Sequence, residues 1–188
     1  DDEGNVALGM AEDYEISDDD LTYTSTLRDD IKWSNGDPVT AEDFEFAWKR
    51  ALDPELAADY AFQIYYIKGG EAYNTGEGSV DDVMVKALDE KTLEVTLESP
   101  TGYFLELTAF YTYYPVNKKV VEENEGWAND AATHVSNGPF KLTEWEHDAS
   151  IKIRKNDNYY DAANVNLDGI DFDIIDDENT AWQGYEGG

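Results

Sequence analysis

Cysteine is absent from the 188 residues, so the chain can form neither disulfides nor thiolate metal sites. Basic residues are scarce as well: 13 Lys and Arg stand against 43 Asp and Glu, which gives a formal net charge of −30 at pH 7. This charge repels nucleic acid and anionic membrane surfaces, and we expect neither as a direct partner. Strong like charge also opposes self-association, which favours a monomer.

Long apolar runs are missing too. No window approaches the roughly 18 apolar residues of a membrane-spanning helix, so none is expected. The first ten residues, DDEGNVALGM, lack the basic region and apolar run of an export signal. We therefore expect a mature or excised sequence.

The side chains that usually carry catalysis are few. His134 and His147 are the only histidines, no phosphate-binding loop of the GxxxxGK type occurs, and Ser136 lacks the surroundings of a nucleophile elbow. The sequence therefore predicts neither an enzyme nor a cofactor.

One acidic run, at residues 171–178, is a candidate calcium site. Asp171, Asp173 and residues 176–178 offer hard oxygen ligands, but the run lacks the spacing and the central glycine of an EF-hand loop. Asp171 and Asp173 are explained as the solvent face of a strand. No metal site is predicted.

The stretch Ile31 to Pro54 has the most explicit structural pattern. Asn35-Gly36-Asp37-Pro38 is dense in turn formers. Thr40 stands where a helix N-cap should be, with Asp43 three residues on, as in a capping box. Apolar residues then recur at three- and four-residue spacing up to Leu52, so the pattern predicts a helix over 41–52 that Pro54 ends.

The rest of the chain predicts two small sheets with short helices. Residues 21–28 read as a strand, and two β-rich runs separated by residues 89–92 read as a hairpin beside it. After the turn at Asn137-Gly138-Pro139 the pattern becomes that of a second sheet, in which Ile170, Phe172 and Ile174 are expected to form a buried face. Further elements are expected as strands at 14–16, 83–87, 93–97, 140–146, 151–155 and 170–175 and as short helices at 57–67, 71–73, 102–110, 117–125 and from Asp177 or Asn179 onward. The predicted fold class is α+β, that is, mixed α/β.

Several segments, taken in order, resemble the solute-binding proteins of peptide- and nickel-importing ABC transporters, and most of all the bacterial oligopeptide-binding proteins. The segments are residues 9–12 and 23–28, KWSNGDPVTAEDFEFAWKRALDP at 32–54, VKALD at 85–89, LEVTL at 93–97, residues 100–104, SNGPFKL at 136–142 and residues 155–160. The resemblance covers nearly the whole chain.

The resemblance implies a function of recognition without chemistry. It implies the substrate-binding component of an ABC importer, which captures oligopeptides outside the cell membrane and delivers them to the permease subunits. It also implies an extracytoplasmic place, in the periplasm or at the cell surface, with membrane contact only through a lipid anchor or the permease. The alternative is a standalone, non-enzymatic interaction module derived from one small domain.

Family members are longer, with two ligand-enclosing lobes and an extra small domain. The resemblance therefore implies that residues 1–135 are this small α+β domain, that residues 136–188 are part of the sheet of the first, periplasmic-binding-protein-like lobe, and that the chain is a fragment. The aromatic stretch 57–67 has two interpretations: its rings pack on the helix over 41–52, or Tyr60 lines the ligand cavity, as a tyrosine does at the matching position of oligopeptide binders. Tyr60 is the one ligand-binding residue that the resemblance predicts.

Overall fold

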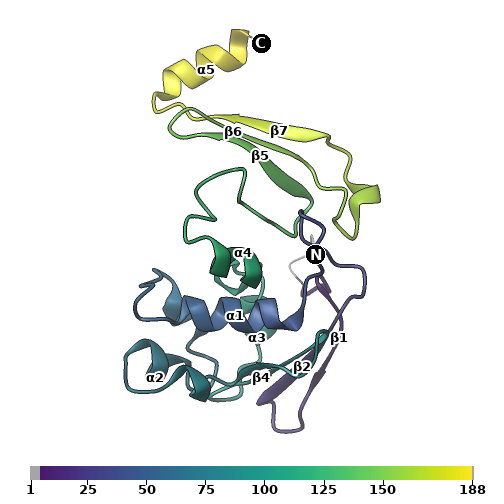
Figure 1. Cartoon of the computed structure of the whole chain (residues 1–188), viewed down its shortest axis with the longest axis vertical. Coiled ribbons are helices and arrows are strands. Elements are labelled where there is room, and N and C mark those ends of the chain that lie inside the picture. Colours follow the sequence, from purple (N-terminus) through teal and green to yellow (C-terminus); the bar gives the residue numbers. More distant parts are fainter. Residues whose placement is uncertain (1–4, 188) are drawn as a thin grey trace. The chain divides into compact units, whose positions relative to one another are not determined.

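A computed structural model describes residues 5–187, and these residues divide into two compact units. Unit 1 contains the described residues up to Ile31 together with residues 38–119, and unit 2 contains residues 32–37 and those from Val120 onward. The structure is mixed α/β, with two antiparallel sheets and mostly short helices, as the sequence predicts (Figure 1).

Unit 1 is built on a four-stranded antiparallel sheet of order β1-β2-β4-β3. Its strands are β1 (Ala11–Ile16), β2 (Thr22–Leu27), β3 (Val85–Ala87) and β4 (Thr92–Thr96). The predicted hairpin is β3–β4, and β4 pairs with β2. Its helical segments are α1 (Ala41–Ala51), η1 (Ala61–Ile64), α2 (Gly70–Asn74), η2 (Val80–Asp82), α3 (Phe104–Leu107), η3 (Tyr111–Tyr113) and the start of α4 (Lys118–Glu123).

Helix α1 begins where the capping pattern predicts. Thr40 is extended, with φ −121° and ψ 163°, and its backbone amide donates to Asp43 Oδ2 at 3.0 Å. The other carboxylate oxygen of Asp43 accepts from the backbone amide of Lys118 at 3.0 Å, so one buried side chain fixes both the helix start and the approach to α4. Phe44, Ala47 and Trp48 form the buried face of the helix.

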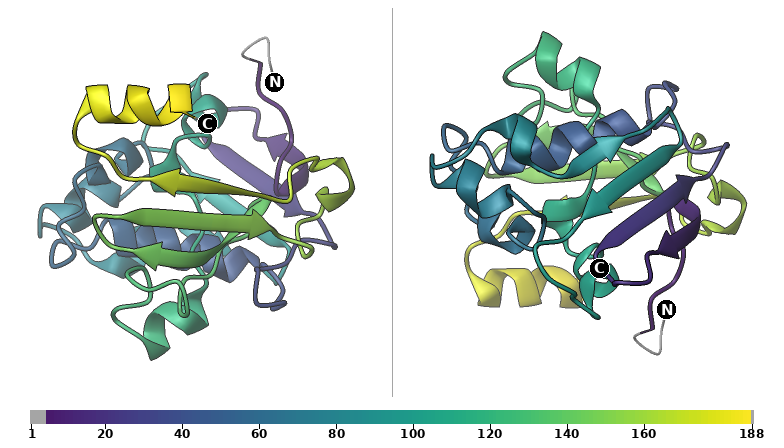
Figure 2. Two further views of the ribbon diagram at one scale, coloured as in Figure 1. Left: turned by 90° about the horizontal axis from the view of Figure 1, so that it is seen from above. Right: turned by 90° about the horizontal axis from the view of Figure 1, so that it is seen from below.

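Helix α1 packs against one face of the unit 1 sheet, over β3 and β4 (Figure 2). Tyr23, Val95 and Val85 lie opposite one another on three adjacent strands, and all are at most 5% exposed. An aromatic series continues this core, because Tyr23 contacts Phe104, whose ring in turn contacts Tyr113. Trp48 completes it with a ring contact to Tyr113 at 5.2 Å and an indole N–H that donates to the Tyr113 carbonyl at 2.7 Å.

Unit 2 contains a three-stranded antiparallel sheet of order β5-β6-β7. The strands are β5 (Phe140–Glu146), β6 (Ser150–Lys155) and β7 (Gly169–Asp173). The 3-10 turn η4 (Ala162–Asn164) lies between β6 and β7 in the sequence, and helix α5 (Glu178–Gly187) follows β7. Asp177 starts α5, since its side chain accepts from the backbone amide of Thr180 at 2.8 Å.

The two motifs rich in Asn and Gly meet inside unit 2. Gly36 adopts φ +94°, a left-handed conformation that glycine takes without strain. The backbone amide of Ser34 donates to the Ser136 carbonyl at 2.7 Å, and the Asn158 side chain donates to the Ser34 carbonyl at 3.1 Å. Asn156, fully buried, donates to the Gly138 carbonyl at 2.8 Å. These motif residues therefore hold loops together and present no reactive group.

One prediction about unit 2 is wrong for this chain. Asp171 and Asp173 are exposed as predicted, but Phe172 and Ile174, expected on a buried face, are 46% and 42% exposed. Among the residues that the structure describes, no helix has the length and apolar character needed to cross a membrane.

Candidate functional site

The predicted ligand-binding residue, Tyr60, lies at the surface of unit 1 just before the 3-10 helix η1. Ala61 and Ile64, three residues apart, point inward and are at most 6% exposed. A 3-10 helix repeats every three residues, so anchoring these two leaves Tyr60 and Phe62 outside, where they are 42% and 51% exposed. The short 3-10 turn replaces the longer helix expected over 57–67.

Tyr60 belongs to a group of four rings that we call the aromatic surface cluster: Tyr60, Phe62, Phe110 and Tyr111. The ring centroid of Tyr60 lies 5.9 Å from Phe62, 5.4 Å from Phe110 and 5.6 Å from Tyr111. Phe110 and Tyr111 contact each other at 4.3 Å. Separations of this size are typical of favourable aromatic pairs, so the cluster is a packed group and not four independent side chains.

Two distant segments build this cluster, and a buried residue joins them. Tyr113 is 2% exposed, and its hydroxyl donates to the Gln63 carbonyl at 2.5 Å, which connects η3 to η1. Desolvation raises the pKa of Tyr113 well above its ordinary value, so the hydroxyl keeps its proton as a donor. Tyr111, at the other end of η3, is 57% exposed and thereby placed beside Tyr60.

Sequence reasoning found only one member of the cluster. Phe62 lies in the stretch 57–67, whose rings are expected to pack on the helix over 41–52, but it is 51% exposed. Phe110, at the end of the short helix predicted over 102–110, is half-buried in the cluster, and no role is predicted for Tyr111. The sequence does contain a signal for the surface position of Tyr111, in the run Phe110-Tyr111-Thr112-Tyr113-Tyr114. In a 3-10 turn, the three-residue period places Tyr111 and Tyr114 on a different side of the chain from buried Tyr113.

The chemistry of the cluster is that of contact and hydrogen bonding. It offers apolar ring faces and two phenol hydroxyls. Desolvation, together with the neighbouring Tyr60 hydroxyl and the charge of Asp59, raises the pKa of Tyr111, so this phenol is neutral at physiological pH. Such a surface can bind an apolar, aromatic or cationic group but has no nucleophile to attack one.

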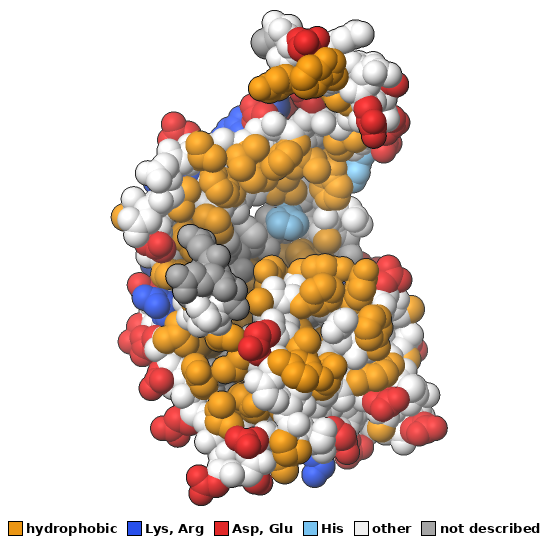
Figure 3. Space-filling view, turned by 180° about the vertical axis from the view of Figure 1, so that it is seen from behind, with side chains coloured by type: hydrophobic (Ala, Val, Ile, Leu, Met, Phe, Trp, Pro, Cys, Tyr) orange, Lys and Arg blue, Asp and Glu red, His pale blue; other side chains and the backbone are white. Residues whose placement is uncertain are grey.

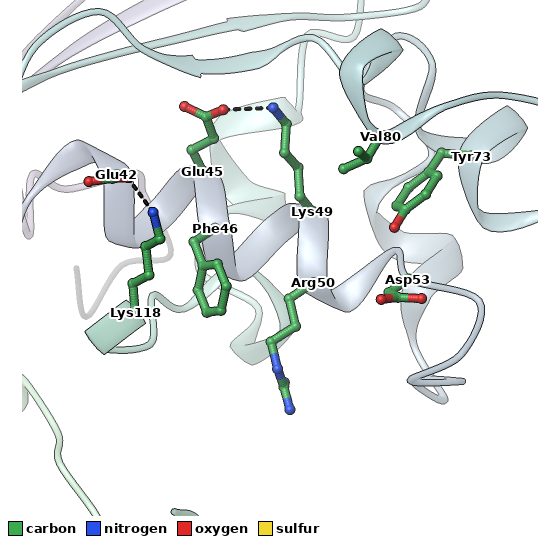
Figure 4. A pocket seen from close by; sticks show the side chains of 9 residues that line it. All are labelled: Glu42, Glu45, Phe46, Lys49, Arg50, Asp53, Tyr73, Val80 and Lys118. Carbon is green, nitrogen blue, oxygen red and sulfur yellow. Dashed lines mark hydrogen bonds and ion pairs between the residues drawn. The ribbon is translucent and has the colours of Figure 1, made fainter. Parts of the chain in front are cut away.

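A hollow of about 350 Å³ runs along α1 in unit 1 (Figure 4). Lys49 donates to Glu45 at 2.6 Å, and Lys118 is paired with Glu42. Glu45 also accepts from the backbone amide of Ala87 at 2.7 Å. Desolvation opposes the charge of Glu45, but the hydrogen bonds from Lys49 and Ala87 outweigh it and lower the pKa of Glu45. The Lys49–Glu45 pair lies within α1, the Lys118–Glu42 pair joins α1 to α4, and the contact of Glu45 with Ala87 joins α1 to β3.

The two histidines have local packing partners. His134 stacks on Trp127 with centroids 6.0 Å apart, and burial lowers the pKa of His134. His147 lies 4.2 Å from Trp145, with Nε2 3.0 Å from the Asn129 carbonyl. Asp171, a candidate calcium ligand, is paired with Arg154. Within residues 5–187 no three His, Asp or Glu side chains gather as a metal site would require.

Comparison with protein families defines the class of this protein. Residues 5–188 match the family model described as "Bacterial extracellular solute-binding proteins, family 5 Middle". The match covers nearly the whole chain, so the chain belongs to this family of solute-binding proteins.

Two individual proteins of known name are similar in sequence to this chain. The chain is 55% identical over 187 residues to the oligopeptide-binding protein OppA of Bacillus subtilis, covering 99% of this chain and 34% of that protein. It is 52% identical to the dipeptide-binding protein DppE of the same organism, covering 95% of this chain and 33% of the relative. The chain thus spans about a third of the length of these relatives.

Solved structures give the same result. The structure of Listeria monocytogenes OppA bound to peptide matches with a TM-score of 0.94 and 40% identity, over 100% of this chain and 37% of that one. The substrate-binding domain of an oligopeptide ABC transporter from Bacillus anthracis matches with a TM-score of 0.93 and 47% identity, over 97% and 35% of the two chains. The fold prediction is therefore confirmed over the described residues.

Proposed function

We propose that this chain is part of the substrate-binding component of an ABC importer, which captures oligopeptides outside the cell membrane and delivers them to the permease. The observation that carries the proposal is the 55% identity, over 99% of the chain, to a protein named as an oligopeptide-binding protein. This relationship supports transport over the alternative of a standalone interaction module. Recognition would rest on contacts to the peptide main chain, with roomy sites for varied side chains.

In this proposal Tyr60 contacts the bound peptide. Its exposure and its place in the aromatic surface cluster support a role in binding over one in stability. Tyr113, whose hydroxyl donates to a backbone carbonyl, has the opposite character.

The same proposal assigns residues 1–135 to a small domain and residues 136–188 to part of a ligand-binding lobe. The second assignment is supported by the sheet of unit 2, whose apolar residues are at best half-buried and gather in a band over that sheet (Figure 3). Relatives about three times as long contain further chain that could cover such a face. The complete protein would act outside the cytoplasm, anchored by a lipid or free in the periplasm, as a monomer without a cofactor or catalytic activity.

The test is native mass spectrometry of the protein that carries this sequence, purified gently from its source. We expect a mass well above 21.2 kDa and, on denaturation, the release of a series of peptide-sized species. Calorimetry with the same preparation should detect peptide binding, whereas residues 1–188 alone should bind peptides weakly or not at all. A protein that releases no peptide and binds none would overturn the proposal.

A further inference from the structure

The two segments that carry the aromatic surface cluster contain acidic but no basic side chains. Residues 51–67 and 92–117, which contain all four rings, include no Lys or Arg, and the nearest basic residues in sequence are Arg50, Lys68, Lys91 and Lys118. The two segments include six acidic residues, namely Asp53, Glu55, Asp59, Glu94, Glu98 and Glu106. The charge of the whole chain, −30, has the same sign, so the long-range field favours a cation.

One of these carboxylates is next to the rings. Asp59 precedes Tyr60 in sequence, is exposed, and has no ion-pair partner among the residues that the structure describes. Its charge reaches the cluster, since it contributes to the raised pKa of Tyr111. Asp59 is therefore an unpaired anion at the edge of an aromatic surface.

The rings of the cluster are packed together but partly exposed to solvent. Tyr60 contacts Tyr111 and Phe110 edge-to-face, at interplanar angles of 82° and 70°, and Phe110 lies at 34° to Tyr111. Tyr60, Phe62 and Tyr111 are each between 42% and 57% exposed. A tyrosine face attracts an ammonium or guanidinium group placed within about 6 Å of its centroid.

We propose that the aromatic surface cluster receives a Lys or Arg side chain of the bound peptide, with its cation over the tyrosine rings and paired with Asp59. The inference rests on the proposed function and adds a side-chain preference to it. An acidic side chain would be repelled by Asp59, and a purely apolar one would desolvate Asp59 without providing a partner for it. A cationic side chain satisfies both the rings and the carboxylate.

The test compares peptides that differ in a single charge. Pentaalanine peptides carrying one Lys at each position in turn are titrated by calorimetry into the longer protein that carries this sequence, alongside the same peptides with acetyl-lysine or Glu. At one position or more we expect Lys to bind about 3- to 30-fold more tightly than acetyl-lysine, corresponding to the usual range for a cation over aromatic rings. Glu should bind most weakly, and the preference should decrease as salt is raised.

Variants separate the two parts of the site. Asp59→Asn should reduce the preference for Lys over acetyl-lysine several-fold, and Tyr111→Leu should reduce it also, whereas Tyr111→Phe should retain most of it because the ring face remains. Tyr14→Leu, at an exposed tyrosine on β1, is the matched control and should leave the ratio unchanged. Thermal melting of each variant checks that the protein is folded.

The outcomes are distinct. Equal affinity for Lys and acetyl-lysine peptides at every position would overturn this inference while leaving the proposed function intact, and tighter binding of acetyl-lysine would mean that the cluster receives apolar groups. If no peptide binds at all, the proposed function fails, and this inference fails with it.

Discussion

The two sheets of this chain follow the same design but differ in how well their apolar faces are covered. In unit 1, the apolar face of β2, β4 and β3 is closed, and Tyr23, Val95 and Val85 are at most 5% exposed. In unit 2, Trp145, Ile151 and Phe172 lie opposite one another in the same way, yet Trp145 and Ile151 are only half-buried and Phe172 is 46% exposed.

The opposite face of the second sheet is as well organised as its apolar face is open. Glu144, Lys152 and Asp171 are aligned across β5, β6 and β7, and Lys152 pairs with Glu144 at 2.8 Å. Arg154 pairs with Asp171 on the same face. One face is thus clearly a solvent face and the other clearly apolar, as expected for a sheet that packs against another layer.

The difference shows what alternation in a sequence can establish. Period-two alternation determines which residues share a face of a strand, but it does not determine whether anything covers that face. Helix α1 covers the first sheet because its own apolar stripe faces β3 and β4. Helix α5 has no such role for the second sheet, since Trp182 and Tyr185 on it are 58% and 80% exposed.

Among the substitutions that test this difference between the two sheets, Trp48→Ala in unit 1 should have the largest effect on stability. The indole is 4% exposed, packs against Phe44 and Tyr113, and donates to a backbone carbonyl. Removing it should lower the free energy of unfolding by about 3–5 kcal/mol, the range for large-to-small changes at buried aromatic sites. Urea unfolding followed by circular dichroism measures the loss.

The matched control is Trp145→Ala on β5, where the same side chain is only half-buried. We expect a loss of about 1 kcal/mol, because less apolar surface is buried there. Equal losses for the two tryptophans would contradict the distinction between a closed core and an open one.

Sequence reasoning succeeded where a local pattern decides the structure. The capping residues Thr40 and Asp43, the hairpin β3–β4 and the alternation in β5 and β6 depend on neighbours in sequence or on strand periodicity. The capping box specifies both the start of α1 and the charge at its positive end, so the prediction there was accurate to the residue.

Prediction from the sequence failed where a contact with a residue distant in the sequence determines the local structure. The short 3-10 turn at Ala61–Ile64 is held by the hydroxyl of Tyr113, fifty residues away from its acceptor, and no local pattern reports such a bond. The exposure of Phe172 and the surface position of Phe110 likewise depend on what packs nearby in space. The aromatic surface cluster was incomplete in the prediction for the same reason, whereas Tyr60 as a ligand contact stays a prediction.

A smaller loss of stability is expected from substitution of Glu45, which joins α1 to the sheet of unit 1. Its pKa in the folded chain lies below the ordinary value of 4.5, so the stabilisation from its charge is present above about pH 4.5 and is lost as the pH falls through the folded pKa. Glu45→Gln should cost about 1 kcal/mol of unfolding free energy at pH 7, since the carboxylate is partly exposed.

The pH dependence distinguishes this charge effect from a packing effect. The difference between Glu45→Gln and the parent chain should shrink as the pH falls below 4.5 and through the lowered folded pKa, because the carboxylate then becomes protonated in both states. A difference that stays constant as the pH is lowered through this range would mean that the glutamine disturbs the packing of α1 and that the charge of Glu45 is irrelevant.

The smallest effect in this chain is expected at the open sheet. Phe172→Ser should lower the free energy of unfolding by less than about 1 kcal/mol, because the ring is 46% exposed, whereas Val95→Ser at a 3% exposed position on β4 should cost about 2–3 kcal/mol.

The longer protein provides the decisive measurement for Phe172. If further chain covers this face, as the assignment of residues 136–188 to a ligand-binding lobe requires, then the same substitution creates a polar group in a core and should cost about 2–4 kcal/mol there. An equally small loss in both proteins would mean that the apolar face remains open in the complete molecule, and the assignment to a lobe would have to be abandoned.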